Sequence, residues 1–171
     1  MANDSLAVFL SIPEKQYAIG EAVPVTIEIR NLSAQPIWFV GVMDGSEEGV
    51  RYPKYAPQIV GPQAMPPAEP LECGLVSPLR MKDFSLLPPG QGFDPTIGQN
   101  GATYFPLRKF TEFRPPSAGR YEFSLTVSTL SQQEEEWLGW PEYDEKAAVL
   151  QRLTEVPRVQ LQSNVASIEV R

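Results

Sequence analysis

Alternating apolar and polar positions dominate the first quarter of the chain. In the segment 23–30, four apolar side chains alternate with more polar neighbours; they are Val23, Val25, Ile27 and Ile29. A period of two residues indicates a strand with one buried face. The segment 6–12 alternates in the same way and ends at Pro13, and the segment 37–43 is rich in β-branched and aromatic residues. The pattern therefore predicts three strands in this region.

Two more strands are predicted late in the chain. After a turn at 117–119, the segment 121–127 alternates large apolar residues with polar ones; the apolar residues are Tyr121, Phe123, Leu125 and Val127. The terminal segment 164–170 repeats the alternation with Ala166, Ile168 and Val170 on one face. We expect this last segment to close a sheet beside an earlier strand.

Prolines set the middle of the chain apart. Ten of the 18 prolines fall between Pro53 and Pro95, and each fixes φ and removes a donor from a strand ladder. We therefore expect extended loops and short edge strands here, with pairing segments at 84–87 and 103–110. Edge-blunting prolines also protect a sheet from pairing with other molecules.

A segment of different character, about 131–160, separates the two late strands. Pro141 is placed to start a helix, Glu142 precedes Lys146 by four residues, and Pro157 ends the run. Tyr143, Ala147 and Leu150 share a face of that helix. We predict a single domain, 1–171, with this segment as a short helical insertion before the last strand.

Together these elements predict an all-β fold, an antiparallel β-sandwich with immunoglobulin-like (Ig-like), Greek-key connections. Tyr121 follows a turn, where Ig-like folds carry a tyrosine that ties the corner between the sheets. Trp38 lies on the third strand, where such folds bury a tryptophan. Phe123 stands where disulfide-bonded members carry cysteine, so a packed ring is expected in place of the bridge.

Five segments carry a family resemblance; they are Tyr17–Glu21, Val25–Asn31, Leu87–Gln91, Ala118–Phe123 and Ser163–Val170. With them the chain resembles bacterial Ig-like domains and, more distantly, the BsuPI-type intracellular proteinase inhibitors. The resemblance implies a scaffold and no activity, because Ig-like scaffolds host many functions. No inhibitory residue is transferred, and the proline-rich middle and the late insertion depart from the compact form of the inhibitors.

Composition narrows the function. The chain has 171 residues, a net charge of −7 and no histidine, so Ser-His-Asp, Cys-His and His-based zinc chemistry are excluded. The negative charge disfavours nucleic acid and acidic membranes as partners. A single cysteine, Cys73, excludes an internal disulfide, and nothing beside it in sequence lowers its pKa towards a reactive thiolate. We expect no catalytic residue, metal or cofactor.

The N-terminal segment 1–16 lacks the charge and cleavage pattern of a signal peptide. If the chain is the full gene product, we expect a cytoplasmic protein that is a monomer or a weak dimer; a mature fragment of a secreted precursor is the alternative.

The insertion holds the strongest candidate binding site. Two tryptophans, Trp137 and Trp140, lie near Tyr143 and behind an acidic run, Glu134, Glu135 and Glu136. Large aromatic residues anchor many protein interfaces, and acids steer basic partners. The alternative is that the rings cap the open end of the sandwich. Ig-like topology places this insertion at the same end as the segment 31–35.

We therefore predict a non-catalytic domain that binds a protein partner, and three alternatives stay open. An inhibitor of a protease or toxin would use the proline-rich segment 52–78 to present residues 79–81. A carbohydrate-binding module would need both Trp137 and Trp140 exposed and coplanar. A carboxylate-based hydrolase would need two acids facing each other across a cleft.

Overall fold

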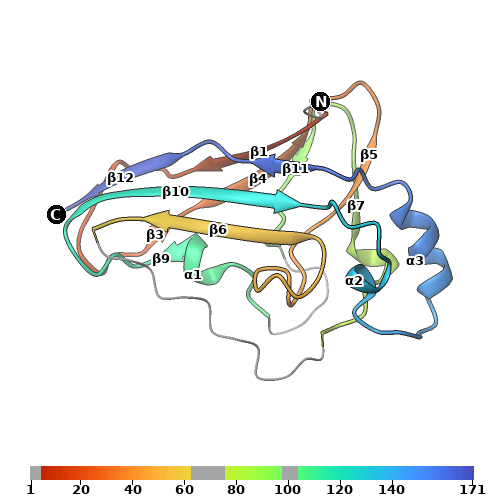
Figure 1. Cartoon of the computed structure of the whole chain (residues 1–171). Coiled ribbons are helices and arrows are strands. Elements are labelled where there is room, and N and C mark those ends of the chain that lie inside the picture. The colour runs from red at the N-terminus through yellow and green to blue at the C-terminus, as the bar shows by residue number, and fades with distance from the viewer. Residues whose placement is uncertain (1–4, 63–75, 98–103) are drawn as a thin grey trace.

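The computed structural model describes residues 5–62, 76–97 and 104–171. The described chain is mostly β, with several antiparallel sheets, and its helices lie mainly at one end (Figure 1). Residues 63–75 of the predicted proline-rich segment 52–78, with Cys73 among them, lie outside the described residues.

The longest strand, β10 (Gly119–Ser128), is central to one sheet. It pairs antiparallel with β6 on one side and with β11 and β12 on the other. Strand β12 also pairs in parallel with β2. The bounds of these partners are β6 (Lys54–Val60), β11 (Gln160–Gln162), β12 (Ala166–Val170) and β2 (Gln16–Tyr17). The prediction that the terminal segment pairs beside an earlier strand is confirmed.

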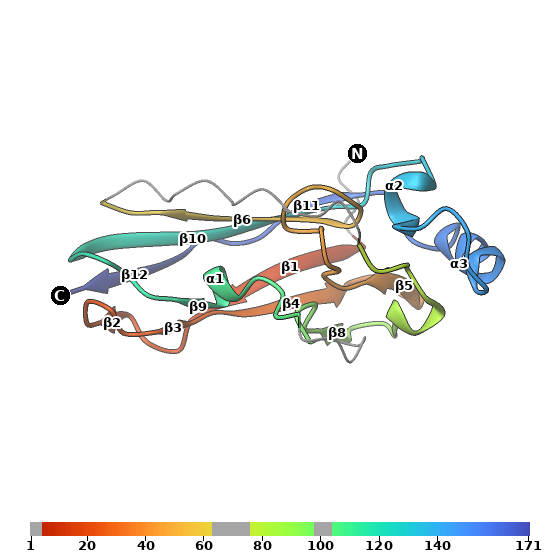
Figure 2. The ribbon, with the colours of Figure 1, turned by 90° about the horizontal axis from the view of Figure 1, so that it is seen from below.

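A second group of strands lies under this sheet in Figure 2. Antiparallel β1 and β4 form its centre, β8 pairs with the other edge of β4, and two further pairs join β3 to β9 and β5 to β7. Their bounds are β1 (Leu6–Ser11), β3 (Val23–Pro24), β4 (Thr26–Asn31), β5 (Ile37–Val40), β7 (Phe84–Leu87), β8 (Gly92–Phe93) and β9 (Glu112–Phe113). Strands are present within the segments predicted at 6–12, 23–30, 37–43 and 84–87, but the segment 23–30 is divided at Val25 into β3 and β4, and the strand predicted at 37–43 ends at Val40.

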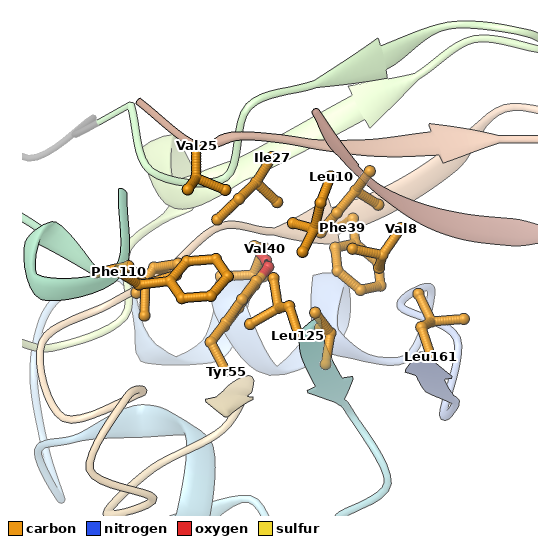
Figure 3. Close-up of a cluster of buried hydrophobic side chains, with 14 of the residues drawn as sticks. Val8, Leu10, Val25, Ile27, Phe39, Val40, Tyr55, Phe110, Leu125 and Leu161 are labelled. Carbon is orange, nitrogen blue, oxygen red and sulfur yellow. The ribbon is translucent and has the colours of Figure 1, made fainter. Parts of the chain in front are cut away.

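The core lies between these two layers and takes the apolar face of each alternating strand. Figure 3 shows side chains from β1, β4, β5, β6 and β10 pointing toward one another, with Phe110 among them. Phe123 is fully buried and its ring makes edge-on contacts with Phe110 and Phe113, both at 5.8 Å between centroids. The expected packed ring at position 123 is confirmed.

The prediction of only short strands in the proline-rich middle is wrong at β6, which pairs along seven residues with β10. Pro57 lies inside this strand opposite Leu125. The N–H and C=O of Leu125 bond to Ser163, on the other side of β10, at 2.9 Å each. Leu125 and Pro57 therefore form a non-hydrogen-bonded pair, in which the backbone groups of the two facing residues point away from each other. The nitrogen of Pro57 points to the outer edge of β6, where proline removes no bond to β10.

The strand predicted at 103–110 is also wrong. The chain there forms a short helix, α1 (Arg108–Thr111), which leads directly into β9. Leu107 is buried and has φ of 55°, a left-handed conformation that breaks an extended run. Phe105 is 67% exposed, so the apolar residues of this segment do not share one face.

Two helices occupy the insertion, where one was predicted. Helix α2 (Glu135–Leu138) precedes Pro141, and α3 (Lys146–Leu153) begins five residues after it. Pro141 therefore does not start the helix, although the expected pair of Glu142 and Lys146 forms at 2.8 Å. A further short 3-10 helix, η1 (Met81–Asp83), leads into β7.

Candidate functional site

The insertion lies at the end of the sheets where β10 ends, beside β5 and β7 (Figures 1 and 2). Trp137 is 1% exposed. Its indole N–H donates to the carbonyl oxygen of Ser131 at 3.1 Å, and its ring lies 5.8 Å from that of Tyr52. The capping interpretation therefore holds for Trp137, which belongs to the core and attaches the insertion to the sheets.

Two arginines of the insertion reinforce this attachment by stacking on aromatic rings. Arg158 lies over the ring of Trp137 at 4.8 Å, and Arg152 of α3 lies over the ring of Trp38 on β5 at 4.0 Å. Such cation–π contacts are attractive because the face of the ring is electron-rich. Trp38 is only partly buried, at the junction with α3, so the expectation of a core tryptophan on this strand needs correction.

Arg51, which the sequence did not single out, joins the same junction. It is 2% exposed, and its pKa is lowered by burial, an effect that the charge of Asp44 opposes. One terminal nitrogen donates to the carbonyl oxygen of Trp137, and the other donates to that of Ser77 and lies 3.5 Å from an Asp44 oxygen. A single arginine in a loop carries no sequence pattern that could have revealed this role.

Trp140 differs from Trp137 because 46% of it is exposed. Its indole N–H donates to the carbonyl oxygen of Val76 at 2.7 Å, which fixes the orientation of the ring. Gly139 turns the chain between the two tryptophans with φ of 78°, and a Cβ there would lie 2.6 Å from the carbonyl oxygen of Ser77. This close turn buries one ring and presents the other.

The acidic residues before Trp137 also differ in their exposure to solvent. Glu134 and Glu135 are exposed, whereas Glu136 is half-buried and accepts a hydrogen bond from the hydroxyl of Ser131. Glu142, one residue beyond Pro141, has 83% of its side chain exposed. The structure therefore leaves Trp140, Glu134, Glu135 and Glu142 at the surface and assigns Glu136 to the interior of the insertion.

Tyr143 is half-buried and packs against the core. Burial raises the pKa of its phenol to about 12, and the positive charge of Arg51 partly offsets this rise. Its hydroxyl is buried and has no hydrogen-bond partner among the described residues. Tyr143 therefore belongs to the base of the insertion and not to the surface that carries Trp140.

Asp83 lies at this base as well and is 3% exposed, the only buried acid of the described residues. One carboxylate oxygen accepts the N–H of Arg80 at 2.8 Å, and the other has no hydrogen-bond partner. Burial raises its pKa, while the hydrogen bond from Arg80 and the charges of Lys82 and Arg51 lower it.

The segment that an inhibitor would present, residues 79–81, is held inward. Leu79 is fully buried and donates its N–H to the carbonyl oxygen of Leu138 at 2.9 Å. The N–H of Met81 donates to a Glu145 oxygen at 2.8 Å. A protease would need this backbone for itself, so these contacts disfavour presentation of residues 79–81. The alternative of a carbohydrate-binding module needs two exposed tryptophan rings, and Trp137 is buried.

No group of three or more acidic, cysteine or histidine side chains within the described ranges is arranged to hold a metal ion. Among the same residues, no helix is long and apolar enough to cross a membrane. Comparison of the chain with protein-family models, curated proteins and solved structures finds no match. The resemblance to Ig-like domains and BsuPI-type inhibitors therefore stays a prediction.

Proposed function

We propose that this chain is a non-catalytic domain with Ig-like topology that binds a protein partner at the exposed side of its insertion. The observation that carries the proposal is the contrast between two neighbouring tryptophans. Trp137 fixes the insertion to the core, and Trp140 is held by one hydrogen bond with nearly half of its surface exposed. The lack of histidine supports a non-catalytic role, because it removes the commonest general base.

Strand order supports the Ig-like part of the proposal. β10 lies between β6 and β12 as strand F lies between strands C and G in an Ig-like sheet. β1 and β4 pair in the other layer, as the first two strands of such folds do. The hydroxyl of Tyr121 lies 3.0 Å from the carbonyl oxygen of Ser117, four residues upstream, which is the contact expected of the corner tyrosine.

Trp140 has the properties of an interface anchor. Tryptophan is enriched among the residues that contribute most to binding, because it buries a large area with few rotatable bonds. The bond to Val76 holds the indole in place before any partner arrives, so less side-chain entropy is lost on binding. The ring is therefore prepared to enter an apolar pocket on another protein.

The exposed acids of the insertion define the chemistry of that partner. Glu134 and Glu135 carry negative charge in the segment that leads into Trp140, while Glu142, beyond Trp140, is paired with Lys146; the whole chain has a net charge of −7. Complementary charge accelerates encounter and selects orientation. The partner is therefore a protein that surrounds an apolar pocket with lysine or arginine side chains.

Photo-crosslinking followed by affinity measurement tests this proposal. A photoreactive amino acid at position 140 identifies the protein that contacts this site in cells. Titration of that purified protein with Trp140→Ala is expected to show at least a ~10-fold loss of affinity, as for an interface anchor. Phe105→Ala is the matched control, because this exposed aromatic residue precedes α1 and lies outside the insertion. Equal affinities for both variants and the wild type would overturn the proposal.

A further inference from the structure

Three polar atoms at the base of the insertion are buried and have no hydrogen-bond partner among the described residues. They are Nε of Arg51, Oδ1 of Asp83 and the hydroxyl oxygen of Tyr143. Nε of Arg158, which lies over the ring of Trp137, is a further buried atom of the insertion without a partner among the described residues. Arg51 and Asp83 are also buried as whole residues, at 2% and 3% exposure. Buried polar groups in folded proteins are nearly always paired, so three unpaired ones indicate a bound molecule that pairs with them.

The three groups come from separate segments that meet at this place. Arg51 precedes β6 and reaches α2 through its bond to the carbonyl oxygen of Trp137. Asp83 ends η1, which the bond from Met81 N–H to Glu145 joins to the start of α3. Tyr143 lies between α2 and α3. The hydrogen bonds from Arg51 to Trp137 and from Met81 to Glu145 therefore bring the segments that carry the three residues to one end of the sheets.

Their chemistry defines what can bind. Both terminal nitrogens of Arg51 have hydrogen-bond partners, whereas its Nε–H, a donor, has none among the described residues. Asp83 Oδ2 is used by the N–H of Arg80, which leaves Oδ1 as an acceptor. The hydroxyl of Tyr143 either donates or accepts. Asp83 repels an anion, Arg51 repels a cation, and an apolar molecule would leave all three atoms unpaired.

We propose that one ordered water molecule occupies this site and bridges Arg51 Nε, Asp83 Oδ1 and the Tyr143 hydroxyl. The water accepts a hydrogen bond from the guanidinium, donates one to the carboxylate and pairs with the phenol. Buried waters typically make about three hydrogen bonds to groups that would otherwise be unpaired. This water joins the loop before β6, η1 and the insertion, and it does so whether or not Trp140 binds a partner.

A crystal structure of the full chain, at a resolution that shows ordered waters, tests the proposal without any variant. We expect a single peak of water density within hydrogen-bond distance of all three atoms, about 2.7–3.2 Å. Direct contacts among the three side chains, an empty site or density for a larger molecule would overturn the proposal.

Magnetic relaxation dispersion of water nuclei in solution gives an independent test, because it counts waters with long residence times. Tyr143→Phe keeps the ring and removes one partner, so we expect the loss of one long-lived water or at least a ~10-fold shorter residence time, as for the loss of one hydrogen bond. Tyr17→Phe is the control, since the Tyr17 hydroxyl already bonds to the N–H of Glu14 at 3.3 Å. An unchanged water count and residence time in Tyr143→Phe would contradict the proposal; if that variant does not fold, the crystal density decides.

Discussion

A terminal nitrogen of Arg51 donates a hydrogen bond to the carbonyl oxygen of Trp137, 86 residues later in the sequence. Arg51 is the only buried cation of the described residues, and Trp137 is the most voluminous fully buried side chain. The bond joins the loop before β6 to the insertion after β10. The orientation of the insertion therefore depends on a buried charge that is paired on several sides.

Replacing Arg51 by leucine is expected to lower the free energy of unfolding by about 3 kcal/mol or more, because the carbonyl oxygens of Ser77 and Trp137 each lose a partner, at roughly 1–3 kcal/mol per group. Urea denaturation measures the change. Arg120→Leu is the control, since 63% of that side chain is exposed, and surface substitutions change stability by about 0.5 kcal/mol or less. Wild-type stability in Arg51→Leu would show that other groups pair with these carbonyls.

The two tryptophans of the insertion are expected to differ in both stability and solvent access. Trp137→Ala should cost about 3–5 kcal/mol, as for a buried aromatic residue, whereas Trp140→Ala should leave the folded state in place. Acrylamide quenching distinguishes the rings without unfolding the protein. In a Trp38→Phe background, which removes the third and partly buried tryptophan, Trp140→Phe should remove most of the emission that the quencher reaches, because Trp137 is 1% exposed and Trp140 is 46% exposed. Undiminished quenching in Trp140→Phe would contradict the assignment.

The buried carboxyl of Asp83 should make stability depend on pH in a predictable direction. Burial raises its pKa above the usual 3.8 in the native state, although the Arg80 bond and the charges of Lys82 and Arg51 oppose the rise. The native state therefore binds more protons between the two pKa values. The contribution of Asp83 to stability is fully present below pH 3.8 and is lost as the pH rises through the native pKa.

Asp83→Asn tests this dependence when unfolding is measured by urea from below pH 3.8 upward. The free energy of the variant relative to the wild type should improve with rising pH in this window, since asparagine does not ionise. The raised pKa of Glu48 acts in the same sense in both proteins and cancels in the difference. Parallel stability curves would show that Asp83 has the same pKa in the folded and unfolded chains.

The stacking of Arg152 on Trp38 should be measurable as a coupling energy. A double-mutant cycle with Arg152→Gln and Trp38→Leu is expected to give about 0.5–1 kcal/mol, the range for a partly exposed cation–π pair. The cycle of Arg152 with Glu155→Gln provides the comparison, because that 3.1 Å ion pair lies at the surface and such pairs contribute only about 0.3–0.5 kcal/mol. No coupling with Trp38 would mean that α3 is held by its apolar face alone.

The corner contact of Tyr121 predicts a loss of about 1 kcal/mol in Tyr121→Phe, the usual contribution of one hydrogen bond. Thermal and urea unfolding both report this change. Ser117→Ala should cost less, because the carbonyl oxygen that pairs with the Tyr121 hydroxyl at 3.0 Å belongs to the backbone and is retained. Equal losses in the two variants would assign the contact to the Ser117 hydroxyl, which also lies 3.0 Å away.

Most strands could be predicted because alternation is a local property. The apolar positions of β4 and β10 are buried and the intervening ones are more exposed, as the sequence indicates. β6 was missed because proline normally argues against a strand, and only its place at the edge of β10 makes Pro57 acceptable. The strand predicted at 103–110 was wrong because apolar residues there suggested a strand, whereas they belong to a loop and a helical turn.

The candidate site shows the same division. Composition and spacing indicated the aromatic and acidic insertion, and they did not separate the buried Trp137 from the exposed Trp140. Arg51, Asp83 and Tyr143 lie far apart in sequence, and no periodicity relates them. Their shared environment arises because the loop before β6, η1 and the insertion meet at one end of the sheets.

The sequence by itself determined which faces of the strands are buried and where an insertion separates the two late strands. It also excluded the chemistries that require histidine. Tertiary structure alone decided which tryptophan anchors and which is presented, and which charged groups are buried together. The physical reason is that hydrophobic alternation follows from the geometry of a single strand. The burial of a charge or a ring depends on partners that only folding brings into contact.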